Sequence, residues 1–257
     1  MKNEILLYLI GTAGSGKSTL AQSYKEWCDL QGLNTVLVNL DPGAEFLPYT
    51  PDVDIRDWIS LQEVMETHEL GPNGAQIVCA DMIAFNAEDI KKSIESFKAE
   101  YILMDTPGQL ELFVFREAGK YTIQFLYPKR SLLCYLLDPA LAKTATGFVT
   151  QLLLSLTTNF RLQYPQLNVV TKTDGLSEEE QDLIRQWSQD PQALYTAVIN
   201  EKTSVHREMS EHIVQLLEQF GGYSELLFTS KEDHYGMDDV YNGVQLLFTG
   251  GDDTLKD

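Results

Sequence analysis

The segment LIGTAGSGKST constrains this chain more than any other stretch. It places the pattern G-x-x-x-x-G-K-[ST] at Gly11, Gly16, Lys17 and Ser18, after an apolar run that predicts a strand and before a periodic run that predicts a helix. The small residues let backbone N–H groups of residues 13–17 surround a polyphosphate, and the helix dipole favours its charge. Lys17 is expected to neutralise the β- and γ-phosphates, and the Ser18 hydroxyl to bind Mg²⁺. We therefore expect nucleotide contacts from Gly11, Ala13, Gly14, Ser15, Gly16, Lys17, Ser18 and Thr19.

Short apolar runs alternate along the chain with longer stretches of helical periodicity. After the first run, Leu20, Tyr24, Trp27 and Cys28 form an apolar helical stripe, and Gly32 is placed to end that helix. This alternation predicts an α/β fold of the P-loop NTPase type, a mostly parallel sheet with helices on both faces. The expected strands are residues 4–10, 35–40, 101–105, 131–138, 167–171 and 225–230.

Four long connections hold enough periodic apolar residues to contain helical insertions. Phe148 and Leu152 belong to one such periodic stretch, and Ser177 with Glu180 forms a capping-box pattern in another. The four connections are residues 42–100, 110–130, 140–166 and 175–224.

Length and composition narrow the classes of protein further. The 257 residues suit one large domain over residues 1–249, followed by an acidic tail at 250–257. The formal net charge of −19 argues against nucleic acid or an anionic membrane as the main partner. The three cysteines lack a C-x-x-C pair, the four histidines show no zinc pattern, and no run is long enough to span a membrane. We therefore expect a cytoplasmic protein with no direct nucleic-acid or membrane partner.

The segment YILMDTPGQLE supplies a second nucleotide motif, D-x-x-G. Asp105 at the end of a predicted strand is positioned to hold Mg²⁺ through a water molecule, and the Gly108 N–H to meet a γ-phosphate. The following loop would order with the triphosphate and relax after hydrolysis. A simple turn at Pro107 and Gly108 is the alternative, which the upstream P-loop disfavours.

Two further strand ends bear on the choice of base. The segment LNVVTKTDGL supplies Lys172 and Asp174, and a buried aspartate there accepts the two N–H donors of guanine but finds no such donors on adenine. The segment FTSKED places Ser230 and Lys231 where a backbone N–H meets guanine O6. Both motifs follow strands, at the edge where open α/β sheets bind ligands. The sequence therefore predicts guanine over adenine.

Taken in order, the segments GTAGSGKST, NLDPG, GPNGA, DTPGQLELF and TKTD make the chain resemble the GPN-loop GTPases, archaeal members included, over essentially its whole length. The resemblance implies a GTPase of the signal-recognition and MinD-type branch that works as a homodimer, with nucleotides at or near the subunit interface. Two positions depart from relatives. Thr12 stands where the MinD branch has a lysine that acts across a dimer, and Thr171 stands where many GTPases have asparagine.

The resemblance also implies roles for several side chains. It places Asp41 near Mg²⁺ and the attacking water. Gln109 is the best candidate to orient that water, since an amide both donates and accepts, and Glu111 is a neighbour that supports the switch or the partner subunit. The charged residues of VDIRDW, Asp54, Arg56 and Asp57, are more simply a solvated turn or a salt bridge.

The segment GPNGAQIV has two interpretations. From the residues alone, Gly71 is the left-handed residue that ends a helix containing Leu61 and Val64, and Pro72 prevents that helix from continuing. The resemblance implies that Gly71, Pro72 and Asn73 reach the phosphate and water site of the other subunit, where Asn73 fixes the reacting geometry through its amide or its backbone.

The motifs thus predict a switch that binds GTP/GDP and hydrolyses GTP with Mg²⁺ and water, and the resemblance implies that this switch is a homodimer. A P-loop nucleotide or metabolite kinase is an alternative, disfavoured by the lack of an arginine-rich lid. A module that assembles protein complexes, in which nucleotide binding matters more than turnover, is another, with an unknown client. The aromatic segment 111–128 is expected to be core and helix packing, or else a dimer or effector groove.

Overall fold

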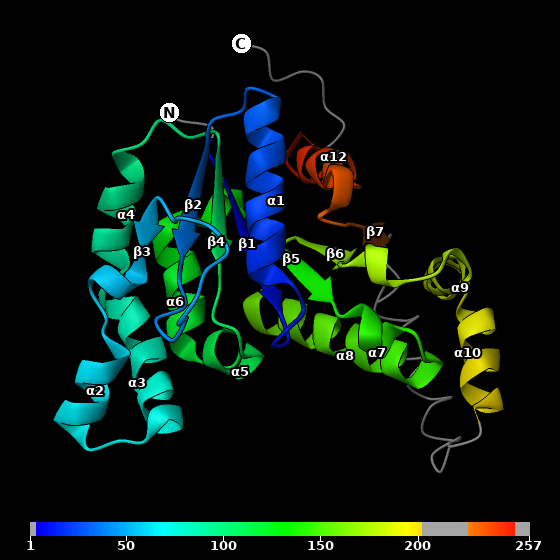
Figure 1. Cartoon of the computed structure of the whole chain (residues 1–257), viewed down its shortest axis with the longest axis horizontal. Coiled ribbons are helices and arrows are strands. Elements are labelled where there is room, and N and C mark those ends of the chain that lie inside the picture. The colour runs from blue at the N-terminus through cyan, green and yellow to red at the C-terminus, as the bar shows by residue number, and fades with distance from the viewer. Residues whose placement is uncertain (1–3, 202–225, 250–257) are drawn as a thin grey trace.

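Parallel strands form the centre of the protein (Figure 1). The computed structural model describes residues 4–201 and 226–249, and in these residues seven strands form one sheet in the order β3-β2-β4-β1-β5-β6-β7. Every neighbouring pair is parallel. The strands are β1 (Ile5–Gly11), β2 (Thr35–Asn39), β3 (Val53–Asp54), β4 (Tyr101–Asp105), β5 (Ser131–Leu137), β6 (Gln166–Val170) and β7 (Leu226–Phe228).

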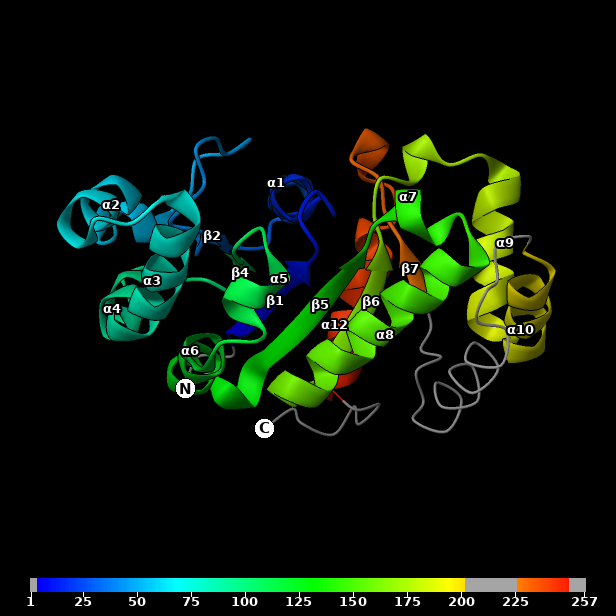
Figure 2. The ribbon, with the colours of Figure 1, turned by 90° about the horizontal axis from the view of Figure 1, so that it is seen from below.

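Helices cover both faces of this sheet. In Figure 2, α1 lies on one side of the strands, and α6 and α8 lie on the other. The helices are α1 (Lys17–Leu30), α2 (Leu61–His68), α3 (Pro72–Phe85), α4 (Ala87–Glu95), α5 (Leu110–Phe113), α6 (Glu117–Leu126), α7 (Pro139–Ala142), α8 (Ala145–Leu162), α9 (Glu178–Gln189), α10 (Pro191–Asn200) and α12 (Met237–Thr249). Short 3-10 turns are η1 (Ile55–Asp57), η2 (Pro128–Arg130), η3 (Thr173–Gly175) and η4 (Glu232–His234).

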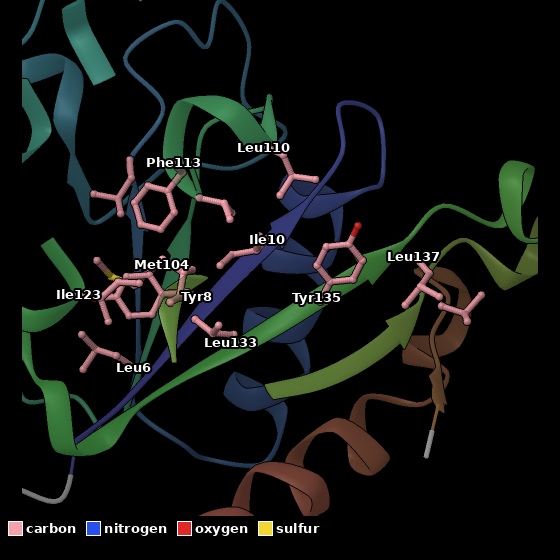
Figure 3. Close-up of a cluster of buried hydrophobic side chains, with 14 of the residues drawn as sticks. Leu6, Tyr8, Ile10, Met104, Leu110, Phe113, Ile123, Leu133, Tyr135 and Leu137 are labelled. Atoms are coloured by element: carbon pink, nitrogen blue, oxygen red, sulfur yellow. The ribbon is translucent and has the colours of Figure 1, made fainter. Parts of the chain in front are cut away.

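The sheet separates two hydrophobic cores. Tyr24 of α1 and Val240 of α12 belong to the first, while the larger second core lies under α3, α6 and α8. Figure 3 shows part of this second core, where Phe113 of α5 lies near Tyr8 of β1, with ring centroids 6.2 Å apart. Strands β1 and β5 are buried throughout. Burial on both faces explains why their sequences are near-continuous apolar runs.

The predicted fold is confirmed. The six expected strands are present with ends shifted by at most two residues, and the two-residue edge strand β3 was not foreseen. Gly32 follows α1 with a φ of 75°, as a helix stop requires. Ser177 and Glu180 form the predicted capping box at the start of α9. Of the connection 175–224, residues 202–224 lie outside the described residues, as does the expected tail 250–257.

The prediction that Gly71 ends a helix in the left-handed conformation is wrong. Helix α2 ends instead at Glu69, which has a φ of 53° and donates its N–H to Met65 O. Gly71 is extended, with φ −71° and ψ 166°, and Pro72 is the first residue of α3. Proline suits this position because its missing N–H is one that a helix start leaves unpaired in any case. The Gly-Pro-Asn segment therefore begins a helix.

Among the helices within residues 4–201 and 226–249, we find none that combines the length and the apolar character of a membrane span.

Candidate nucleotide site

The carboxyl ends of the parallel strands bring the sequence motifs to one edge of the sheet. After β1, the phosphate loop places Gly14 and Gly16 in the left-handed region, with φ of 78° and 94°. A Cβ at Gly11 would lie 2.5 Å from Ser15 Oγ, and one at Gly16 would lie 3.3 Å from Lys172 Cε. Both conformation and space therefore require the glycines of this loop.

Lys17 points back into the loop and joins it to the D-x-x-G motif. Its Nζ donates to Gly11 O at 2.9 Å, Thr12 O at 3.0 Å and Gly108 O at 3.0 Å. Burial lowers the pKa of Lys17 to about 8, against the charges of Asp105 and Asp41, which raise it. The side chain is thus a desolvated cation whose present partners are neutral carbonyls, which suits it to a polyphosphate.

Asp105 ends β4 beside Ser18 and is 2 % exposed. One oxygen, Oδ2, accepts the Tyr49 hydroxyl at 2.7 Å, whereas Oδ1 is buried and has no hydrogen-bond partner within the described residues. Burial raises the pKa of Asp105, while the hydrogen bond from Tyr49, the neighbouring Ser18 hydroxyl and the charge of Lys17 oppose the rise. A buried carboxylate oxygen without a partner fits a metal ion or a metal-bound water.

The described residues contain no group of three or more His, Cys, Asp or Glu side chains that could hold a metal ion. Mg²⁺ bound to nucleotides usually has only one or two carboxylates and takes its remaining ligands from phosphates and waters. The donor set of Ser18 and Asp105 is therefore suited to Mg²⁺ in the company of a nucleotide.

Asp41 links the two segments that the sequence assigns to switching. Its Oδ1 accepts the Gly43 N–H at 2.9 Å, and its Oδ2 accepts the Gly108 N–H at 3.0 Å. The N–H expected to meet a γ-phosphate thus binds a carboxylate of the same chain. Gln109 and Glu111, next along the chain, have exposed side chains. Leu110 and Phe113 anchor this segment in the second core (Figure 3).

Asn39 was not identified from the sequence, yet its hydrogen bonds hold the Asp41 segment in place. This fully buried amide donates to Asp41 O at 3.2 Å and Asp54 Oδ1 at 2.9 Å, and accepts the Asp41 N–H at 3.0 Å. Arg56 pairs with Asp54 and donates to Ala44 O at 2.9 Å. Although burial raises it, the hydrogen bonds from Arg56 and Asn39 hold the pKa of Asp54 below its ordinary value.

The salt-bridge interpretation of Asp54 and Arg56 is therefore confirmed, while Asp57 is exposed. This ion pair ties both ends of the turn that carries Asp41.

A pocket of 310 Å³ adjoins the phosphate loop. The Thr171 hydroxyl donates to Ser15 O at 2.6 Å, and Lys172 Nζ donates to Gly14 O, so the T-K-x-D motif braces the loop without asparagine. The residues around the pocket are Gly16, Thr19, Leu20, Ser23, Thr171, Lys172, Asp174, Gly175, Thr229, Ser230, Lys231 and Met237.

Asp174 stands at this pocket with an exposed side chain, so the expectation of a buried carboxylate is wrong for the protein without a base beside it. Its Oδ1 accepts the Ser230 hydroxyl at 2.7 Å, which fixes the carboxylate. The Ser230 N–H already donates to Tyr235 O at 3.1 Å. Within the described residues the Lys231 N–H has no such backbone partner.

The Gly71, Pro72 and Asn73 segment is exposed at the start of α3. No side chain caps this helix, and in Figures 1 and 2 the start of α3 lies apart from the phosphate loop at the start of α1. Along α3, Gln76 and Ala80 line a narrow crevice with Asp41 and Gly43. The structure therefore does not bring Asn73 to the nucleotide site of its own chain, although its helix contacts that site.

One ion pair that sequence reasoning missed connects α3 to the D-x-x-G segment. The Arg116 guanidinium, just after α5, binds both oxygens of Asp81, with Nε at 2.5 Å from Oδ1. Nothing in the spacing of Arg116, Asn39 or Tyr49 signals their contacts with Asp81, Asp54 and Asp105, because each of these partners is distant in sequence. The expectation of a packed aromatic segment holds for Phe113, whereas Tyr121 remains half exposed.

Known proteins are similar to this chain in sequence and in fold. A family model described as a conserved hypothetical ATP binding protein matches residues 9–250. The chain is 30% identical to "GPN-loop GTPase 3" of Mycosarcoma maydis over 91% of this chain and 89% of that protein. It is 30% identical to a GPN-loop GTPase of Pyrococcus abyssi over 92% and 94% of the two chains.

A crystal structure of a GTPase in apo form from Pyrococcus abyssi has a similar fold, with a TM-score of 0.85 and 26% identity, over 96% of this chain and 99% of that one.

Proposed function

The chain belongs to the GPN-loop GTPase family, and from this premise we propose a cytoplasmic homodimeric switch that hydrolyses GTP to GDP and phosphate with Mg²⁺. The observation that carries the proposal is one edge of the sheet, where the phosphate loop, the Asp105 carboxylate and the Asp174 pocket adjoin. Phosphoryl transfer depends mainly on positioning and on electrostatic stabilisation, and these three parts supply both.

Base selection supports GTP over ATP. The free oxygen of Asp174 and the Lys231 N–H offer an acceptor and a donor, which match guanine N1, N2 and O6. Adenine presents the opposite pattern at these positions, so it would leave both groups unpaired. None of the residues around the pocket is an arginine, which weighs against the lid of a nucleotide kinase.

The protein would distinguish GTP from GDP through a change of the hydrogen-bond acceptor of the Gly108 N–H. GTP places a γ-phosphate where the Gly108 N–H now binds Asp41, so Asp41 has to release that donor, whereas GDP has no γ-phosphate to compete for it. Asp41 then carries an unpaired carboxylate oxygen beside the reacting phosphate. Gln109, adjacent to Gly108 and exposed, is placed to orient the attacking water.

Ser18 and Asp105 would hold Mg²⁺, which supplies positive charge that neutralises the phosphate oxygens. Lys17, whose Nζ is held by the carbonyls of Gly11, Thr12 and Gly108, adds a second positive charge.

The homodimer and the action of Asn73 on a partner subunit rest on α3. A Cβ at Gly71 would meet no atom within 4 Å, and its backbone is in a region open to every residue. One chain therefore has no need of glycine there. Glycine does leave the first N–H groups of α3 uncapped and approachable, and such N–H groups bind anions. We propose that the anion is a phosphate group bound at the nucleotide site of a second copy.

An assembly role is favoured by a separate surface. Phe85 of α3 is 85% exposed, and it lines a hollow of 370 Å³ with Tyr121 and Phe125 of α6. Contiguous exposed aromatic side chains mark interaction sites on soluble proteins.

Mixing two inactive variants tests the proposal. Lys17→Ala lacks the phosphate cation but keeps Asn73, and Asn73→Ala lacks the amide but keeps Lys17. Each homodimer should hydrolyse GTP slowly, whereas a mixed dimer unites an intact phosphate loop with an intact GPN segment, so activity should exceed that of either parent. Asn242→Ala, which removes an exposed amide from α12, is the matched control.

No gain on mixing would refute action across the dimer and leave GTP hydrolysis standing. Turnover of ATP in preference to GTP by the natural protein would refute the GTPase assignment itself.

A further inference from the structure

Tyr49 reaches the metal side of the nucleotide site from a distant segment. It lies in the stretch between β2 and β3, and its hydroxyl donates to Asp105 Oδ2 at 2.7 Å. Its ring packs against the core formed by α1 and α12. The ring is thus held by apolar contacts while the hydroxyl alone meets the carboxylate.

The hydrogen bond makes the two oxygens of Asp105 unequal. Oδ2 is occupied by Tyr49, and Oδ1 is buried with no hydrogen-bond partner within the described residues. A carboxylate can rotate about its Cβ–Cγ bond, and a donor on one oxygen limits that rotation. The contact therefore fixes the plane of the group and leaves Oδ1 as the oxygen with both lone pairs available.

Tyr49 acts as the donor in this contact, because a carboxylate oxygen only accepts and the phenol supplies the O–H.

We propose that Tyr49 is a positioning residue for the Mg²⁺ carboxylate, holding Oδ2 of Asp105 so that Oδ1 faces the metal and its waters. The inference rests on the Mg²⁺ dependence in the proposed function. Donors that orient a metal-binding carboxylate typically contribute 10- to 100-fold to metal affinity, so about 10-fold is the expected scale.

Tyr49 and Asp41 belong to the same connection between β2 and β3, so this one segment binds both the metal carboxylate and the Gly108 N–H. Release of Asp41 by a γ-phosphate thus occurs in a segment that Tyr49 keeps attached to β4.

Tyr49→Phe removes only the hydroxyl and keeps the packed ring. The assay is the release rate of a fluorescent GDP analogue as free Mg²⁺ is varied with a chelator, which needs no turnover. We expect the Mg²⁺ concentration for half-maximal slowing of release to rise about 10-fold, with release in excess chelator unchanged. The matched control is Tyr127→Phe, whose hydroxyl donates to Glu95 at 3.2 Å.

An unchanged half-maximal Mg²⁺ concentration in Tyr49→Phe, beside a natural protein that responds to Mg²⁺, would overturn this inference alone. A lower concentration would also overturn it, because Tyr49 would then obstruct the metal. If release from the natural protein ignored Mg²⁺, the metal part of the proposed function would fall together with the inference. Thermal unfolding of both variants monitors the fold, and Tyr49→Trp, which retains an N–H donor, should restore part of the Mg²⁺ response.

Discussion

Replacing Asp174 by asparagine tests the choice of base with a change of one atom type. The natural carboxylate has Oδ1 fixed by the Ser230 hydroxyl at 2.7 Å and stands at the pocket beside the phosphate loop. Guanine offers this carboxylate two donors, N1–H and the 2-amino group. Asparagine keeps one acceptor but turns an NH₂ toward the guanine amino group, so one hydrogen bond is lost and two donors oppose each other.

The size of the effect follows from the bonds involved. A hydrogen bond to a charged group contributes about 1.5–3 kcal/mol and one to a neutral group about 0.5–1.5 kcal/mol, so losing one charged bond and weakening the other to a neutral bond costs roughly 2.5–4.5 kcal/mol. Because Asp174 is exposed before the base binds, the lower end applies, and about 2.5 kcal/mol corresponds to a roughly 70-fold loss of GDP affinity. Xanthine carries an oxygen in place of the 2-amino group and accepts the asparagine NH₂, so the variant should prefer xanthosine diphosphate.

Displacement of a fluorescent GDP analogue by GDP, ADP and xanthosine diphosphate measures all three affinities. Asp138→Asn is the control, since Asp138 caps α7 by accepting the Ala140 N–H at 3.0 Å and asparagine caps equally well. Undiminished GDP affinity in Asp174→Asn would refute the assignment. Equal binding of ADP and GDP by the natural protein would refute it too, and would favour the adenine nucleotide in the description of the matching family model.

Two further substitutions probe the surroundings of the site. Gly119→Ala should lower the free energy of unfolding by about 1–3 kcal/mol in chemical denaturation, because its Cβ would lie 2.1 Å from Phe113 O. The control Gly175→Ala, whose Cβ would meet nothing within 4 Å, should change the free energy of unfolding by less than about 0.5 kcal/mol. Equal losses in the two variants would contradict the steric argument. Arg56→Ala removes the tie to Ala44 O and should slow GTP turnover about 10-fold with GDP affinity retained, and a parallel fall in both would instead indicate general loss of the fold.

The sequence predicted well where the motifs lie at the carboxyl edge of the sheet, because the properties of strands and loops there depend on residues that are close together in the chain. The phosphate-loop motif specifies glycine at 11 and 16, and in the structure Gly16 is left-handed while a Cβ at Gly11 would lie 2.5 Å from Ser15 Oγ. Asp105 and Asp174 follow runs that are apolar because they are buried on both faces, so their place at the carboxyl ends follows from the parallel sheet.

The side chains that support these groups escaped prediction because their partners are set by strand register. Asn39 lies level with both Asp54 and Asp105, on neighbouring strands of the sheet, and no spacing along the chain encodes this. Tyr49 meets Asp105 across 56 residues of sequence. The error at Gly71 had a local cause, since a helix stop and a helix start both favour glycine followed by proline, and only Glu69 in the left-handed region decides between them.

That correction changes what a nucleotide can do to the GPN segment. A loop after a helix stop would move independently, but Asn73 lies in the first turn of α3, whose later turns contact the site. Gln76 borders the Asp41 turn, and Asp81 is bound by Arg116 beyond the D-x-x-G segment. If a γ-phosphate displaces Asp41 from Gly108, the contacts on both flanks of α3 change. A rigid helix then transmits this change to Asn73. Occupancy of one site would then adjust the segment that we propose acts on the other, so the two sites of the proposed dimer should not hydrolyse GTP independently.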